Sequence, residues 1–168
     1  AELGLASASP ASAGGQKRLW AGGLPSSPGE LLWNAAGTGV YYTMEEKGSS
    51  NLYFLPLDGA PRKLTDGVQM IAQASMAKTG DVAAVRSTFH EPGSLVAFNA
   101  SAAQNIRKVL DLNSDVLEGR VLGDVEEMWW NSADGWKVQG WLVKPAGFDP
   151  QKKYPLVPYI HGGPWSMY

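Results

Sequence analysis

The sequence contains no cysteine and only two histidines among its 168 residues. The absence of cysteine excludes disulfides, cysteine-ligated zinc and a thiol nucleophile. His90 and His161 stand far apart in the sequence and are poor material for a metal site, so we expect no cofactor and no metal. A cysteine-free chain suits a reducing compartment. We therefore expect a cytoplasmic protein, while a periplasmic or secreted location stays open.

The chain also lacks an excess of basic residues and any long apolar run. Its 14 Lys and Arg residues against 16 Asp and Glu give a net charge of −2, and the basic residues form no stripe that would neutralise a phosphate backbone. No run approaches the roughly 18 apolar residues that a membrane span needs. The start carries neither an initiator Met nor the basic and apolar parts of a signal peptide, so we expect the natural N-terminus to be missing. We expect no nucleic-acid partner and no membrane partner.

Residues 1–29 have few side chains able to form a core. Ala, Gly, Ser and Pro account for 20 of these 29 residues, and such a composition buries little surface while its ordering costs much entropy. We expect a loose segment here. The run QKRLWAGG is the exception, because Leu19 and Trp20 are suited to an outer strand.

From residue 30 to residue 113 the sequence changes to short strand-like runs separated by Gly- and Asp-containing turns, with almost no helical periodicity. The runs form two series that correspond to each other. The first series is 30–34, 39–45, 51–57 and 61–65, and the second is 68–76, 81–87, 94–100 and 106–110. The series align at offsets of 41–45 residues, for example Leu52 with Leu95 and Arg62 with Arg107.

Two four-stranded units of this size are typical of β-propeller blades. An antiparallel meander whose even spacing imitates a repeat is the alternative. A closed propeller needs roughly four to eight blades. We therefore expect the remainder of a larger protein, or self-association, to cover the open strand edges.

Residues 114–168 change character again. A connecting stretch leads to two strand-like arms, 126–131 and 136–144, around a Ser-Ala-Asp-Gly turn, which predicts a hairpin with one buried face. The run YPLVPYI, 154–160, reads as a third strand, although Pro158 suits an edge position.

The third strand leads into His161-Gly162-Gly163-Pro164. Two residues without side chains let the backbone adopt unusual dihedral angles and bring an N–H close to a ligand. Such an N–H, fixed at the end of a strand, suits an oxyanion hole. A Gly-Gly-Pro bend without function is the alternative.

The run SADGWKVQGWLVKPAGFDPQKKYPLVPYIHGGP, 132–164, resembles the start of the catalytic domain in the prolyl oligopeptidase family of serine peptidases. The branch most similar to it is the acylaminoacyl-peptidase and dipeptidyl-peptidase-like one, and residues 37–67 are similar to blades of that branch's propeller. The resemblance implies a mainly β chain: a loose segment at 1–29, about two propeller blades over 30–113, and over 114–168 the first strands of a truncated α/β-hydrolase domain. It also implies a short peptide as substrate.

By this resemblance Gly163 would supply the first oxyanion-hole amide, Gly162 would allow the turn, and His161 would shape the loop. A Gly-x-Ser-x-Gly nucleophile motif occurs nowhere in the sequence, so neither nucleophile, acid nor base is expected in this chain. Ser166 does not lie on a strand-to-helix turn and is not a substitute.

The other residues with reactive or aromatic side chains are better explained by structural roles than by functional ones. His90 reads as a loop residue between two strands. The adjacent Glu126 and Glu127 point to opposite faces of a strand and are better explained as a solvated connector than as a paired-carboxylate amine site. The hairpin tryptophans are better explained as core than as ligand-stacking surfaces; they are Trp129, Trp130, Trp136 and Trp141.

Three functional hypotheses remain from the sequence. The first is a part of a serine peptidase for short peptides that is inactive on its own, because an oxyanion donor without its nucleophile has no intermediate to stabilise. The second is a non-catalytic β-propeller-type module that binds a peptide or protein through its strand edges. The third is a decayed gene product, whose unpaired strands would make it insoluble.

Overall fold

The computed structural model describes residues 3–5, 18–21, 24 and 26–162. Most of these residues lie in strands, and the helical segments among them are a 3-10 turn at Ala100–Ala102 and a single α-helical turn, α1, at Ser114–Leu117. No helix in the described part of the chain is long and apolar enough to cross a membrane. The prediction of a mainly β chain is confirmed.

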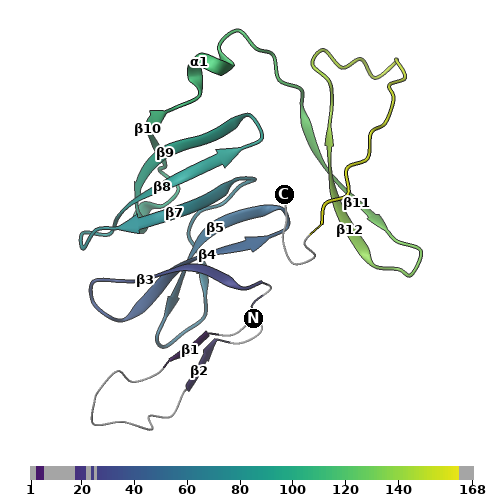
Figure 1. The fold of residues 1–168 in the computed structure, drawn as a ribbon. Coiled ribbons are helices and arrows are strands. Elements are labelled where there is room, and N and C mark those ends of the chain that lie inside the picture. Colours follow the sequence, from purple (N-terminus) through teal and green to yellow (C-terminus); the bar gives the residue numbers. More distant parts are fainter. Residues whose placement is uncertain (1–2, 6–17, 22–23, 25, 163–168) are drawn as a thin grey trace.

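The largest sheet has eight strands and is built from two units of consecutive antiparallel strands (Figure 1). The first unit comprises β3 (Pro28–Trp33), β4 (Gly39–Glu46), β5 (Ser49–Pro56) and β6 (Arg62–Lys63). The second comprises β7 (Met70–Met76), β8 (Asp81–Thr88), β9 (Glu91–Asn99) and β10 (Arg107–Asp111). A single parallel pair, Ser50 with Met70, joins the two units.

The two units share their strand register. Corresponding Cα pairs are Tyr41–Phe54 and Ala83–Ala97, Thr43–Leu52 and Val85–Leu95, and Phe54–Arg62 and Ala97–Arg107. The offsets found in the sequence, 43 for Leu52 and 45 for Arg62, thus hold for individual strand pairs. This agreement favours a true repeat over accidental even spacing.

Each unit also has a β-bulge at the same position of its first strand. The register shifts between Gly29 and Leu32 in β3, and between Ala72 and Ser75 in β7. Two residues of the bulged strand lie opposite one residue of its partner, and the first of the two is Glu30 in one unit, with φ 41°, and Gln73 in the other, with φ 52°. Positive φ is unfavourable for residues with a side chain, so both units keep the same strained backbone at the same place.

The core lies between the two units and on the outer face of the first. Side chains from both units form the first cluster, whose fully buried members include Leu52, Ile71, Val82 and Val96. The second cluster lies on the other face of β4 and β5 and is covered by Leu24. The described residues cover the second unit on one face, while Leu95 on its other face keeps 36% of its surface exposed.

Within residues 1–29, where the composition predicts little order, the structure describes two short strands. They are β1 (Leu3–Leu5) and β2 (Arg18–Ala21), which pair antiparallel to each other. The expected outer strand at Leu19 and Trp20 coincides with β2, and its partner in the structure is β1.

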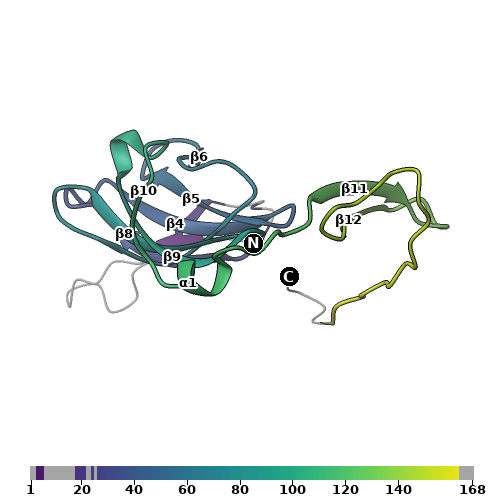
Figure 2. The same cartoon turned by 90° about the horizontal axis from the view of Figure 1, so that it is seen from above.

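The C-terminal part forms a hairpin beside the sheet (Figure 2). Strands β11 (Val125–Asn131) and β12 (Lys137–Val143) pair over seven residues. Their bounds agree with the two predicted arms, 126–131 and 136–144, to within one residue.

The predicted third strand at 154–160 is wrong. Residues 153–162 have no regular secondary structure, and their large apolar side chains are exposed, from 40% at Tyr154 to 91% at Ile160. Pro155 and Pro158 remove two backbone donors, and no described strand pairs with this stretch. An apolar run does not form a strand unless a neighbouring strand is present to share backbone hydrogen bonds with it.

Candidate functional site

The predicted oxyanion loop lies at the end of the described chain. Gly163 falls outside the described residues. His161 and Gly162 are exposed, and the Nδ1 atom of His161 lies 2.8 Å from the carbonyl oxygen of Gly162. Gly162 is not among the glycines with positive φ, and a Cβ there would meet no atom within 4 Å. The described part of the loop thus shows no local need for glycine at position 162.

The structure brings the hairpin against two corresponding turns of the sheet units. At the β4–β5 turn, the backbone oxygen of Lys47 accepts a hydrogen bond from Gln139 Nε2 at 3.0 Å. The Trp141 ring lies on Gly48, where a Cβ would come within 2.7 Å of Trp141 Cζ2. Gly48 therefore allows the indole to approach the turn.

The β8–β9 turn supplies the second half of this contact. Phe89 meets the edge of Trp141 with ring centroids 4.9 Å apart. His90 Nε2 lies 2.8 Å from the carbonyl oxygen of Gly123, which immediately precedes the hairpin region. The prediction that His90 is a loop residue between two strands is confirmed. We call Lys47, Gly48, Phe89 and His90 the hairpin contact region.

An open hollow of about 270 Å³ lies beside this contact. Its lining includes charged groups of both signs and one indole, from Glu46, Lys47, Lys63, Asp66, Glu127 and Trp141. A smaller hollow of about 170 Å³ lies between the two turns, and its lining includes Gly48, Val68 and Phe89. Both hollows border the hairpin contact region, but only the larger one has hairpin residues, Glu127 and Trp141, in its lining. A ligand in the larger hollow would therefore touch the sheet and the hairpin together.

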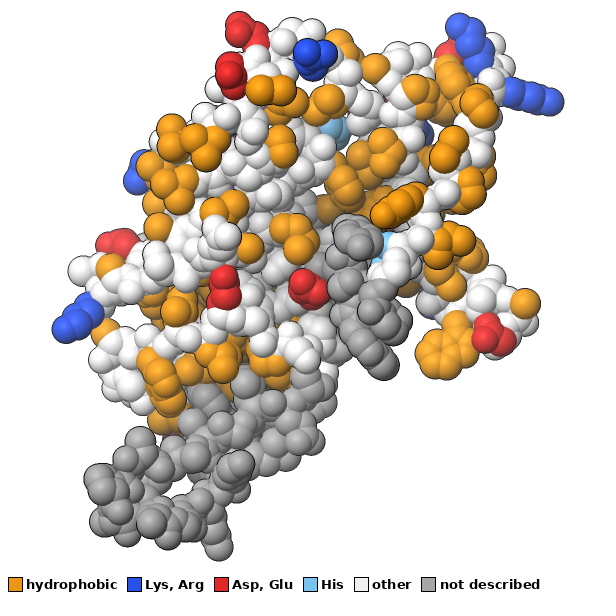
Figure 3. Space-filling model, in the orientation of Figure 1, with side chains coloured by type: hydrophobic (Ala, Val, Ile, Leu, Met, Phe, Trp, Pro, Cys, Tyr) orange, Lys and Arg blue, Asp and Glu red, His pale blue; other side chains and the backbone are white. Residues whose placement is uncertain are grey.

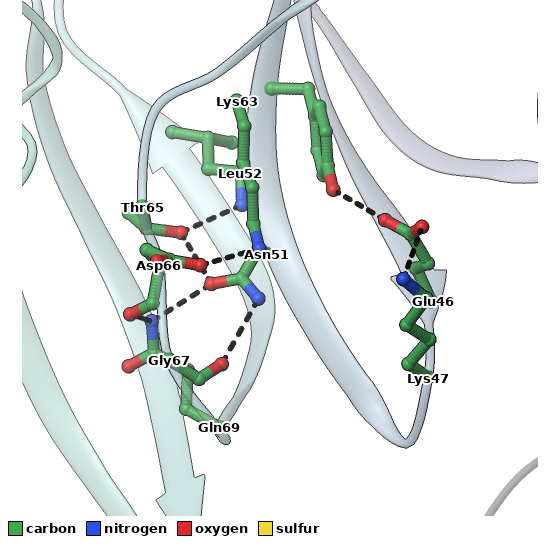
Figure 4. Close-up of polar contacts among 10 residues, drawn as sticks. Glu46, Lys47, Asn51, Leu52, Lys63, Thr65, Asp66, Gly67 and Gln69 are labelled. Atoms are coloured by element: carbon green, nitrogen blue, oxygen red, sulfur yellow. Dashed lines mark hydrogen bonds and ion pairs between the residues drawn. The ribbon is translucent and has the colours of Figure 1, made fainter. Parts of the chain in front are cut away.

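The charged groups of the larger hollow are already paired. Lys63 Nζ lies 2.5 Å from Asp66 Oδ1, and this hydrogen bond lowers the pKa of Asp66. The Tyr53 hydroxyl donates to Glu46 Oε2 at 3.4 Å (Figure 4). Burial, followed by the charge of Glu46, raises the pKa of Tyr53 to about 12. At pH 7 the Asp66 carboxylate is therefore ionised and the Tyr53 hydroxyl is neutral.

A buried polar network lies next to Asp66 and Gly67, which line the hollow (Figure 4). Asn51 Oδ1 accepts hydrogen bonds from Thr65 Oγ1 and Gln69 Nε2, both at 2.9 Å. Thr65 Oγ1 in turn accepts from the backbone N–H of Leu52 at 2.9 Å. Arg86 Nε donates to Gln69 Oε1 at 2.8 Å and extends the network into β8. These bonds fix the segment that joins the first unit to the second.

The adjacent carboxylates of the hairpin are both exposed, as predicted for solvated side chains, and they lie in β11 rather than in a connector. Glu126 forms an ion pair with Lys144. Glu127 Oε1 accepts from Trp129 Nε1 at 2.8 Å and from Gln139 Nε2 at 2.6 Å. Each carboxylate thus has its own partner.

The prediction that the hairpin tryptophans form a core is wrong for three of the four. Trp129, Trp130 and Trp136 are 48%, 49% and 74% exposed, while Trp141 is partly buried on the sheet. Hydrophobic side chains gather over the hairpin and the stretch that follows it (Figure 3). The exposure of Trp129, Trp130 and Trp136 shows that the described residues leave these three rings largely uncovered.

No group of three or more His, Asp or Glu side chains in the described part of the chain is placed to hold a metal ion. The residues that sequence reasoning missed are those of the hairpin contact region and their partner Gln139. The sequence gives no local signal for this contact, because Gln139 and Lys47 stand 92 positions apart and meet only in the folded chain.

The chain is similar to known proteins both in sequence and in fold. No model of a known protein family matches the chain. The chain is 32% identical over 142 residues to dipeptidyl-peptidase 5 of Arthroderma otae, covering 82% of this chain and 19% of that protein. It is 31% identical over 157 residues to a probable dipeptidyl-peptidase 5 of Aspergillus clavatus, covering 86% of this chain and 20% of that protein. The chain thus spans about a fifth of the length of these relatives.

A similar fold occurs in the acylaminoacyl peptidase of Pyrococcus horikoshii. The two chains are 23% identical with a TM-score of 0.71, and the match covers 91% of this chain and 23% of that one. At this identity the likeness concerns the fold alone. Because the match covers 91% of this chain, it includes most of both sheet units and of the hairpin.

Proposed function

Because the chain belongs to the prolyl oligopeptidase family of serine peptidases, in its acylaminoacyl-peptidase and dipeptidyl-peptidase-like branch, we propose that it is part of an enzyme that hydrolyses peptide bonds of short peptides. The observation that carries this proposal is the match at 32% identity to a dipeptidyl-peptidase 5, which runs through most of the chain. The names of the relatives suggest an enzyme that removes dipeptides or acylated residues from peptide ends.

In this proposal the two four-stranded units are β-propeller blades. Their shared register and shared bulges support it, since propeller blades are four-stranded and repeat at such intervals. The hairpin of β11 and β12 is the start of an α/β-hydrolase domain. Its contact with corresponding turns of both units supports a position of that domain beside one end of the blades.

The loop at 161–163 is the oxyanion loop of the proposed enzyme. A backbone N–H of Gly163 would stabilise the negative oxygen of a tetrahedral intermediate. Gly162 and His161 shape the approach to it. The chain has no Gly-x-Ser-x-Gly motif, so residues 1–168 alone are proposed to be inactive.

The test compares residues 1–168 with the product of the full reading frame. Both are assayed with acylated and free-amino chromogenic peptides and with a serine-directed phosphonate probe. Cleavage and labelling by the longer product alone is the expected result. If the longer product neither cleaves nor labels, the peptidase proposal is wrong.

A second arm of this test addresses Gly163. Gly163→Pro removes the backbone N–H and is expected to lower kcat by about 10²–10³-fold, the usual effect of losing one oxyanion donor. Gly163→Ala keeps the N–H and should lose far less. Equal losses in both variants would mean that the amide is not the donor.

The alternative, a non-catalytic module that binds a peptide or a protein, is supported by the exposed edges of β3 and β10. It predicts that residues 1–168 bind peptides while the longer product stays unlabelled by the phosphonate. The two proposals therefore give opposite results in one assay.

A further inference from the structure

The chain contains three Asp-Gly pairs that the sequence alone does not distinguish. They are Asp58-Gly59 in the bend after β5, Asp66-Gly67 between β6 and β7, and Asp134-Gly135 in the turn of the hairpin. In such a pair the backbone nitrogen of the glycine can approach the side-chain carboxyl carbon of the aspartate, because glycine carries no side chain that would shield the nitrogen. The three pairs are therefore candidates for the same intramolecular reaction.

This reaction loses one water molecule and then regains it. A C–N bond forms between the glycine nitrogen and the aspartate Cγ, a C–O bond of the protonated carboxyl breaks, and the hydroxyl leaves as water with the amide proton. Water then opens the resulting five-membered succinimide ring. Opening at the former backbone carbonyl leaves the main chain running through the side-chain carbonyl, which is an isoaspartate with an α-carboxylate. The first step needs an accessible glycine N–H and a carboxyl that can be protonated.

At Asp66-Gly67 both reacting groups are held by hydrogen bonds. The carboxylate is paired with Lys63 Nζ at 2.5 Å, and it also accepts from the backbone N–H of Gly67. The hydrogen bond from Lys63, followed by the one from Gly67, lowers the pKa of Asp66, so less of the neutral carboxyl is present at a given pH. Attack at this pair therefore requires existing hydrogen bonds to break.

The Asp134-Gly135 pair is held in a similar way by the hairpin turn. The Ser132 hydroxyl donates to the Asp134 carboxylate, and the N–H of Gly135 donates to the backbone oxygen of Ser132 at 3.0 Å. The hydrogen bond from Ser132 lowers the pKa of Asp134. The turn thus ties the attacking nitrogen to a carbonyl and favours the ionised carboxylate, which reacts poorly.

The Asp58-Gly59 pair has neither restraint. Both residues are exposed and lie in a bend between β5 and β6. Neither the Asp58 carboxylate nor the Gly59 N–H forms a hydrogen bond or an ion pair with any described residue. The attacking nitrogen and the carboxyl carbon can therefore meet without breaking an existing contact within the described chain.

We propose that Asp58 is a modification site that isomerises spontaneously to isoaspartate, while the hydrogen bonds at Asp66 and Asp134 protect those two residues. The inference goes beyond the proposed function and does not depend on it. The product keeps one carboxylate, so the charge is unchanged, but the main chain between β5 and β6 becomes one bond longer. Because β6 pairs with β5 in a fixed register, such as Tyr53 with Lys63, the longer connection weakens this pairing. The new α-carboxylate is the group that an isoaspartyl carboxyl methyltransferase would modify.

The test stores the product of the full reading frame at pH 6 in water labelled with ¹⁸O, because each passage through the succinimide adds one heavy oxygen. Digestion with trypsin in ordinary water then places the three pairs in separate peptides, 48–62, 64–78 and 121–137. Fragment ions in the mass spectrometer assign the label to the aspartate. We expect peptide 48–62 to gain label about fivefold faster than the other two, since a hydrogen bond that must break slows attack by about two- to tenfold. Equal rates in the folded protein, or faster labelling of either other peptide, would overturn the inference.

A denatured sample and two variants separate the effect of the fold from that of the dipeptide. In guanidinium chloride the three peptides should gain label within about twofold of one another, because the hydrogen bonds are gone. Ser132→Ala should raise labelling of peptide 121–137 in the folded protein by about two- to tenfold. Asp58→Glu keeps the charge but would need a less favourable six-membered ring, so peptide 48–62 should stay unlabelled. A difference between the peptides that persists in guanidinium chloride, or no response to Ser132→Ala, would show that these hydrogen bonds are not the protection.

Discussion

Gly48 is constrained by its backbone and by its neighbour at once. Its φ is +68°, and a Cβ would come within 2.7 Å of the Trp141 ring. Gly37 has nearly the same φ, +66°, but a Cβ there would meet nothing within 4 Å. The pair therefore separates the cost of the left-handed conformation from the cost of displacing the indole.

We expect Gly37→Ala to lower the free energy of unfolding by about 1 kcal/mol, the penalty of an alanine at positive φ. Gly48→Ala should lower it by about 2 kcal/mol or more, because the indole must also move. Urea denaturation of both variants beside the parent protein measures the difference. Equal losses would show that Trp141 does not pack on Gly48 in solution.

Asn51 is a second residue that is difficult to replace, because its side-chain amide is buried and hydrogen-bonded. Only 2% of its surface is exposed, and its Oδ1 is the shared acceptor for Thr65 and Gln69. Asn51→Ala leaves two buried donors without that acceptor, which is expected to cost about 2–3 kcal/mol. Thermal or urea unfolding checks this value. Asn105→Ala, at an exposed asparagine, is the control and should stay within about 0.5 kcal/mol of the parent.

At the scale of elements, each unit ends its last strand with the same ion pair. Lys63 pairs with Asp66, and Lys108 pairs with Asp111, in both cases three residues apart. In the second unit Lys108 also pairs with Glu91 at the start of β9. The hydrogen bond from Lys108 lowers the pKa of Glu91 and of Asp111. Lys108 therefore links the last two strands of its unit.

These lowered pKa values predict how stability depends on pH. A carboxylate with a lowered folded-state pKa contributes stability above its unfolded value, here 4.5 for Glu91 and 3.8 for Asp111, and loses it as pH falls through the lowered value. Lys108→Met should therefore flatten the fall of Tm between pH 5 and pH 2.5. Lys153→Met, at an exposed lysine, is the control. An unchanged slope in Lys108→Met would contradict the linkage.

The strands of the two units were predictable from the sequence, and their observed bounds differ from the predicted ones by at most three residues. Their alternation and turn residues are local signals. The bulges at Glu30 and Gln73 carry no such signal, because positive φ normally selects glycine or asparagine. The stretch 154–160 shows the opposite error, since its apolar pattern suggests a strand that two prolines and the lack of a neighbour prevent.

The candidate site was predictable only in part. His90 was identified as a loop residue, but its contact with Gly123 depends on how the connector folds back. The sequence predicts a core position for the tryptophans, because they lie where a hairpin is expected to pack. A core at this position requires other residues to pack over the hairpin face. The described residues leave Trp129 and Trp130 about half exposed.

At the scale of the whole molecule, the hairpin is held to the sheet by a small contact. Phe89→Ala removes the edge-to-face contact with Trp141, which is worth about 0.5–1.5 kcal/mol. We expect trypsin to cut the exposed connector after Arg120 roughly two- to tenfold faster in this variant. Mass spectrometry of timed digests of the full-length protein measures the rate.

Phe148→Ala is the control for this prediction, because Phe148 packs on Tyr154 within the C-terminal part, with ring centroids 5.1 Å apart, and is not part of the hairpin contact region. Its digestion after Arg120 should match that of the parent. Equal acceleration in both variants would mean that Phe89 does not hold the hairpin.

The separation of Gln139 from Lys47 has a consequence for synthesis. Their hydrogen bond spans 92 residues, whereas the strands within each unit pair with the next strand in sequence. A ribosome adding about 5–20 residues per second makes Lys47 roughly 5–18 s before Gln139. Late in that interval the first unit is complete while its partner is still being translated. Slow codons between Phe89 and Gln139 would prolong the time in which Gly48 and Phe89 are open to the wrong contacts.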